Sequence, residues 1–159
     1  MKKICSSVAI CFAVLCCGSA HAQLADKKVL TVVEAKKAMA AAVAEAEKNG
    51  WGMVIAVVDE SGFPILLERM DKAQKASVDI AVGKARTAAL FRRPSGALEE
   101  AIAKGRTALV SVEGYAFLQG ALPIVISGEI IGAIGVSGMA SNQDEQVARV
   151  GVDAVMKGK

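Results

Sequence analysis

The distribution of cysteine and histidine limits what this chain can use to hold a fold together. All four cysteines (Cys5, Cys11, Cys16 and Cys17) and the single histidine, His21, lie within the first 22 of 159 residues. Beyond that point, disulfides, zinc sites made of cysteine and histidine, and Ser-His-Asp or Cys-His nucleophiles are excluded. The remainder of the chain therefore has to fold around an apolar core without such cross-links.

The first 22 residues have the pattern of an export signal. Lys2 and Lys3 form a charged start, an apolar run follows from Ile4 to Cys17, and Ala20-His21-Ala22 precedes the expected cut. The apolar run has 14 residues, fewer than the ~20 that a membrane-spanning helix needs. A lipoprotein signal is the alternative, but the residues before the candidate cysteines are not small. We predict a cleaved signal at 1–22, one domain at 23–159, and a periplasmic or secreted protein that is not in the membrane.

Removal of this segment leaves an almost neutral domain. Lys2 and Lys3 are lost, so Lys+Arg falls from 19 to 17 against 16 Asp+Glu, which is a net charge of +1. The whole chain has one Trp, one Tyr and four Phe. A domain with neither a basic surface nor many aromatic residues lacks the features that bind nucleic acid, so we expect no nucleic-acid partner.

The apolar pattern predicts helices arranged around two hairpins. The expected helices are 31–49, 77–91, 95–104 and one from Ser141 or Asn142 onward, and the expected strands are 51–58, 63–70, 123–126 and 130–137. Residues 110–119 are ambiguous and are expected to form a strand with a loop. This order predicts an α+β fold with one antiparallel sheet. Because the strands are apolar on both sides, we expect both faces to be covered, by helices or by another subunit.

The helix predicted at 77–91 has polar side chains on an otherwise apolar flank. This flank contains Ser77, Ile80, Lys84, Thr87, Ala88 and Phe91. A buried ammonium is costly unless it is paired, so an acidic group, Asp71 or Asp144, should meet Lys84. Lys84 and Thr87 are then either the polar lining of a ligand pocket or part of a subunit interface along which the lysine extends to water.

Three further segments are candidates for chemistry. Arg69-Met70-Asp71 ends a strand just before that helix, where side chains often face a cleft, although a turn aspartate and an edge arginine are equally expected. Gly132 to Gly138 resembles a phosphate-binding loop, but its glycines interrupt a strand and more often permit close backbone approach. Gln143-Asp144-Glu145 is explained by helix capping and the helix dipole.

Together these segments resemble the GlcG/HbpS family, also called haem-degrading-domain or extracellular haem-binding proteins. The resemblance is carried by residues 57–62, 69–73, 77–81, 84–89, 122–124, 132–138 and 143–145. It extends from Leu30 to Ala154, and the joint order of the segments is more specific than any one of them.

The resemblance implies a three-layer α/β/α, profilin-like fold with a five-stranded antiparallel sheet and assembly into dimers or higher oligomers. Some members of the family bind haem or protect against its iron, and one exported member serves a two-component sensor. Others are connected with cobalamin or glycolate metabolism. Within the family, an exported member fits the haem-handling branch best.

Haem would need an unusual iron ligand in this chain, because no histidine or cysteine follows residue 22. The available oxygen, lysine and sulfur ligands are Thr87, Lys84, Met70 and Tyr115. Thr87 is the first choice for an iron contact, since it shares a helix flank with Phe91.

The leading hypothesis is an exported homo-oligomer that binds haem or another tetrapyrrole as a scavenger, buffer or sensor accessory. Its predicted ligand-binding residues are Arg69, Met70, Asp71, Ser77, Lys84, Thr87, Phe91 and Asp144, with Arg69 on a propionate. A second hypothesis is an enzyme or accessory protein for a glycolate-type organic acid or a cobalamin-related ligand, in which Lys84 and Asp71 or Asp144 form an acid–base pair. A third is a structural module whose polar flank seals an oligomer.

Overall fold

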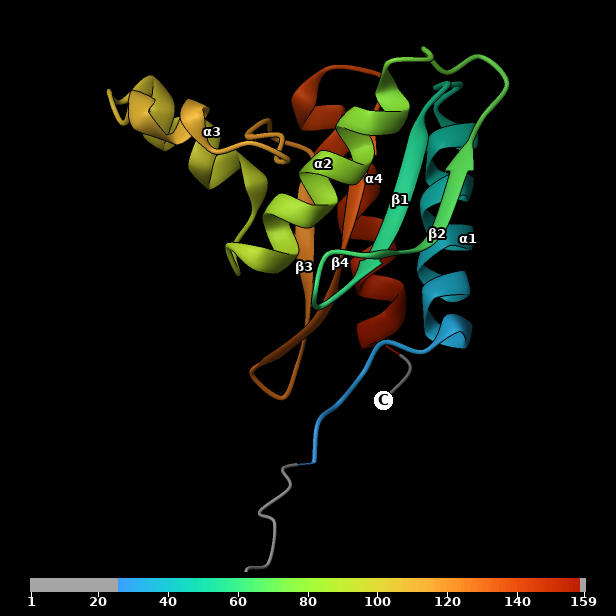
Figure 1. The fold of residues 1–159 in the computed structure, drawn as a ribbon. Helices are drawn as coiled ribbons and strands as arrows, with labels where there is room; N and C mark the ends of the chain where they lie inside the picture. Colours follow the sequence, from blue (N-terminus) through green and yellow to red (C-terminus); the bar gives the residue numbers. More distant parts are fainter. Residues whose placement is uncertain (1–25, 158–159) are drawn as a thin grey trace, which may run out of the picture.

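The computed structural model of the chain describes residues 26–157 (Figure 1). Its elements are α1 (Val32–Lys48), β1 (Val54–Asp59), β2 (Pro64–Arg69), α2 (Ser77–Leu90), α3 (Ser95–Ala103), the 3-10 helix η1 (Thr107–Ser111), β3 (Ala121–Ile126), β4 (Glu129–Ser137) and α4 (Ser141–Met156). The predicted export signal at 1–22 lies outside the described residues. Within 26–157, no helix combines the length and apolarity that crossing a bilayer requires.

The strands form one antiparallel sheet in the order β2-β1-β4-β3. The expectation of five strands is wrong for the described part of the chain, which has four. The segment 110–119, expected to hold a strand with a loop, contains the end of η1 and an irregular connection instead. Its backbone at Ala116 bonds the Thr87 side chain of α2, so that part of the segment is attached to a helix and not to the sheet edge.

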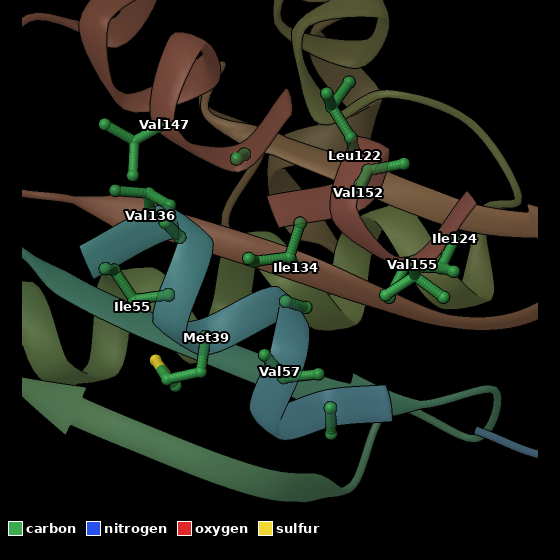
Figure 2. Packing of buried hydrophobic residues seen from close by; sticks show 14 of the residues in the cluster. Met39, Ile55, Val57, Leu122, Ile124, Ile134, Val136, Val147, Val152 and Val155 are labelled. Atoms are coloured by element: carbon green, nitrogen blue, oxygen red, sulfur yellow. The ribbon is translucent and has the colours of Figure 1, made fainter. Parts of the chain in front are cut away.

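Helices cover both faces of the sheet, as the apolar strands predicted. Helices α1 and α4 lie on one face and α2 lies on the other (Figure 1). Figure 2 shows the larger core, where strand residues such as Ile55 and Ile134 meet Met39 of α1 and Val147 of α4. Its apolar side chains are removed from water, which is the main favourable contribution to folding.

The α2 face is packed differently, because small residues line both sides of the contact. Gly135 of β4 pairs with Ala56 of β1 on one side and Ala121 of β3 on the other. A Cβ at Gly135 would meet the backbone of Ala81 and Ala85 in α2. The strand glycine therefore permits the helix to lie close to the sheet. This agrees with the sequence analysis, which favoured close backbone approach over phosphate binding for the glycines of 132–138.

Candidate functional site

Lys84 and Asp144 form a buried ion pair between α2 and the first turn of α4. The Lys84 Nζ lies 2.7 Å from Asp144 Oδ2 and 3.1 Å from the Val136 carbonyl oxygen. The two side chains are 2% and 3% exposed, respectively. The prediction that an acidic group meets Lys84 is confirmed, and the group is Asp144.

The surroundings of this pair are closed. The Met139 N–H donates to Asp144 Oδ1 at 3.0 Å, and a Cβ at Gly120 would lie 2.8 Å from Lys84 Nζ. Burial raises the pKa of Asp144, because removal from water penalises the carboxylate more than the bonds from Lys84 and Met139 compensate. In this conformation the pair joins α2, β4 and α4, and neither charge is presented to a ligand.

Thr87 connects α2 to the segment that follows η1. Its side chain is fully buried, and its Oγ1 lies 2.8 Å from the Gly83 carbonyl oxygen and 3.1 Å from the Ala116 carbonyl oxygen. The same oxygen accepts a bond from the Ala116 N–H at 3.2 Å. A hydroxyl has one proton and two lone pairs to share. The Gly83 and Ala116 backbone groups use most of this hydrogen-bonding capacity. The iron contact assigned to Thr87 stays a prediction, and these bonds argue against it.

Replacing Thr87 by valine keeps the side-chain volume and removes this hydroxyl. We expect the free energy of unfolding to fall by about 1–3 kcal/mol, because the Ala116 N–H and C=O lose a buried partner. Amide hydrogen exchange should accelerate more around Ala116 than in β1, where it should change only by the loss of global stability. Unchanged exchange at Ala116 would show that the hydroxyl does not hold the segment.

Phe91, directly after α2, belongs to an aromatic cluster. Its ring centroid lies 5.1 Å from that of Tyr115 and 5.5 Å from that of Phe117, both edge-on. The guanidinium carbon of Arg86 lies 5.8 Å from the Tyr115 centroid. Ser77, at the other end of α2, is buried, with 3% of its surface exposed.

An apolar depression of about 480 Å³ lies beside this cluster, and we call it the aromatic hollow. It is lined by Glu99, Ile102, Ala103, Val110, Val112, Tyr115, Phe117 and Leu118. Val110 is 69% exposed and Leu118 is 43% exposed, so apolar side chains face water here. A second depression, lined in part by Arg86, shares Tyr115 with it. Sequence reasoning missed this hollow, although Tyr115 and Phe117, two residues apart, were an available indication.

Arg69, Met70 and Asp71 lie elsewhere, at the end of β2. With Trp51 they line a cavity of about 420 Å³, which we call the α1–β2 cavity. The eight predicted ligand-binding residues are thus not brought into one pocket. Seven of them divide between this cavity, the closed Lys84–Asp144 pair with Thr87, and the aromatic cluster. The eighth, Ser77, is buried at the start of α2 and belongs to none of the three. Among residues 26–157, no group of three or more His, Cys, Asp or Glu side chains is placed to hold a metal ion.

Comparisons with known proteins agree with this fold. The family model described as "Haem degrading protein HbpS-like" matches residues 30–153. Protein GlcG of Escherichia coli K12 is 43% identical over 111 residues, which are 70% of this chain and 83% of GlcG.

Two solved structures have the same architecture. The Klebsiella pneumoniae protein ORFY superposes with a TM-score of 0.80 at 27% identity, over 87% of this chain and 98% of that one. A double mutant of HbpS from Streptomyces reticuli superposes with a TM-score of 0.79 at 33% identity, over 95% and 97% of the two chains. The family match over most of the chain, the GlcG relative and these structures together show that this protein belongs to the HbpS-like family.

Proposed function

We propose that this protein binds haem or a related tetrapyrrole at the aromatic hollow, as an exported homo-oligomer that serves as a scavenger, buffer or sensor accessory. The observation that carries the proposal is the exposed apolar depression beside Phe91, Tyr115 and Phe117. The name of the matching family, which refers to haem degradation, supports the choice of ligand.

The apolar and aromatic residues of the hollow suit a flat apolar ring, whose acidic side groups would extend toward the neighbouring depression that Arg86 lines. Valine, isoleucine and leucine side chains supply the apolar surface, and aromatic rings favour stacked or edge-on contact with a macrocycle. Arg86, next to Tyr115, supplies a guanidinium for a carboxylate. The group would bring its own iron chemistry, and the protein would supply enclosure and orientation.

The geometry also changes the choice of iron ligand. Lys84 is paired with Asp144, and the Thr87 hydroxyl is bonded to the backbone. The half-buried Tyr115 lies in the wall of the hollow, and a tyrosine oxygen is a known type of haem ligand. Tyr115 therefore replaces Thr87 as the proposed iron contact, and Arg86 replaces Arg69 as the proposed partner of a propionate.

The acid–base alternative, in which Lys84 and Asp144 act on an organic acid, has less support. Both groups are 2% exposed, whereas a catalytic acid or base must come within hydrogen-bond reach of its substrate. The structural role of the pair accounts for its geometry without a substrate.

Titration of the protein with haemin, followed at the Soret band, tests the proposal. We expect saturable binding, weakened about tenfold or more by Val110→Asp, because a carboxylate would face the apolar ring. Val33→Asp is the matched control, since Val33 in α1 is 64% exposed and lies outside the hollow. Tyr115→Phe should shift the Soret maximum if the phenol oxygen meets iron.

Three outcomes would each contradict one part of the proposal: the ligand, its place on the protein, or the iron contact. Absence of a saturable shift would reject haem as the ligand. Equal binding by the two aspartate variants would place haem elsewhere, and an unchanged spectrum in Tyr115→Phe would reject the iron contact. Native mass of the same sample tests the homo-oligomer.

A further inference from the structure

The α1–β2 cavity lies where three elements come together at one end of the molecule. In Figure 1, α1 ends, β1 begins and β2 ends at this same end, the upper one in the view. The cavity is lined by Glu47, Gly50, Trp51, Gly52, Glu68, Arg69, Met70, Asp71 and Lys72. It is separate from the aromatic hollow, with which it shares no lining residue.

The walls of the cavity are built on fixed parts of the fold. Trp51 and Met70 are half-buried and pack against the core between the sheet and α1 and α4. The Met70 N–H donates to the Met53 carbonyl oxygen at 3.0 Å. A Cβ at Gly52 would lie 2.7 Å from the Lys72 Cβ, so the two segments cross in contact. The segment that carries Trp51 is therefore held in place by the contacts of Met53 with Met70 and of Gly52 with Lys72.

The charges around the cavity favour a cation. Glu47, Glu68 and Asp71 supply three carboxylates, against the two cations of Arg69 and Lys72. The ion pairs found among residues 26–157 include none of these five side chains. Glu47 also belongs to the last turn of α1, where the helix dipole is negative. The lining thus carries one carboxylate more than it carries cations.

We propose that the α1–β2 cavity is a second ligand site, for a small organic ammonium ion. The ammonium lies beside Trp51, between the carboxylates of Glu47 and Glu68. Aromatic rings attract such cations through the negative face of the π system, and carboxylates add charge attraction. A volume of about 420 Å³ is at the low end of ligand pockets, roughly 300–1,000 Å³, which suits a small molecule. This site does not depend on haem binding.

Fluorescence of Trp51 provides a direct test, because it is the single tryptophan of the chain. We expect choline to change the emission saturably and sodium propionate, at the same ionic strength, to leave it unchanged. Replacing both Glu47 and Glu68 by glutamine should weaken choline binding about three- to tenfold. Glu129→Gln, in the turn at the start of β4, is the matched control and should leave the affinity unchanged.

Several results would overturn this site. An emission that choline does not change saturably would do so, as would an equal affinity in the double variant and in the control. Tighter binding of propionate than of choline would identify an anion site instead. Val110→Asp should not affect choline binding, so failure of the haem proposal and failure of this one are distinguishable.

Discussion

Replacing Lys84 by methionine is expected to lower the free energy of unfolding by about 3–5 kcal/mol at pH 7, the usual cost of leaving one member of a buried ion pair alone. The Asp144 carboxylate would keep the Met139 N–H at 3.0 Å but lose the ammonium at 2.7 Å. Methionine fills much of the volume of the lysine side chain, so the loss reports mainly on charge.

The cost of Lys84→Met should depend on pH in a defined direction. Burial already raises the pKa of Asp144, and the Lys84 ammonium opposes that rise, so the variant should raise it further. A carboxyl whose pKa is higher in the folded than in the unfolded state binds more protons when folded. The stability that this extra proton binding adds is therefore fully present below the unfolded pKa of the carboxyl. It is lost as the pH rises through the folded pKa. We expect the destabilisation to shrink as the pH falls from 7 toward the unfolded pKa of an aspartate.

Urea unfolding of the variant at several pH values measures both effects. The double variant Lys84→Met, Asp144→Leu removes both charges and should recover much of the loss, because apolar replacements of buried pairs are often neutral. Recovery should be incomplete, since the Val136 carbonyl oxygen and the Met139 N–H lose a partner. Lys104→Met is the exposed control. Its side chain is 72% exposed and that of its partner Glu100 is 64% exposed, so we expect almost no change in stability. A cost of Lys84→Met that does not vary with pH would contradict the assignment to Asp144.

Replacing Gly135 by valine is expected to be similarly damaging, for a steric reason. A Cβ at this position would overlap the Ala81 carbonyl oxygen and lie 2.6 Å from the Ala85 nitrogen. These are backbone atoms of α2 and cannot turn aside, so the helix would have to move off the sheet. We expect a loss of about 3 kcal/mol or more, the upper part of the range for overpacked cores.

Thermal unfolding measures this effect as a lower Tm, by on the order of 10 °C for a domain of this size. Gly128→Asn is the control, because a Cβ at Gly128 meets no atom within 4 Å and its φ is +81°, a conformation that asparagine tolerates. A Gly135→Val protein as stable as the control would show that α2 does not lie as close to the sheet as the structure places it.

Much of the fold could be predicted from local pattern. The helix capped by Thr31, whose Oγ1 accepts a bond from the Glu34 N–H at 3.3 Å, and the two hairpins follow from apolar periodicity and turn residues. The prediction failed at 110–119, where valines favour a strand locally but η1 and the bonds of Thr87 to Ala116 hold the segment away from the sheet.

The candidate site was predicted only in part, because a helical flank shows which side chains share a direction and not what lies opposite them. Lys84 and Thr87 were rightly singled out as polar groups among apolar neighbours, and both are buried. Their partners, Asp144 and the backbone of Ala116, are 60 and 29 residues away along the chain. Nothing local could show that these partners close the flank or that Tyr115 lines a separate hollow.

The sequence by itself determined the family, the order of helices and hairpins, and the need for an acidic partner at Lys84, because these depend on composition and short-range periodicity. The tertiary structure decided that α2 lies on glycine and alanine across three strands, that the buried charges neutralise each other, and that exposed aromatic and charged groups collect in two separate cavities. The physical reason is that burial, pairing and cavity formation depend on contacts between residues far apart in the chain, which only packing brings together.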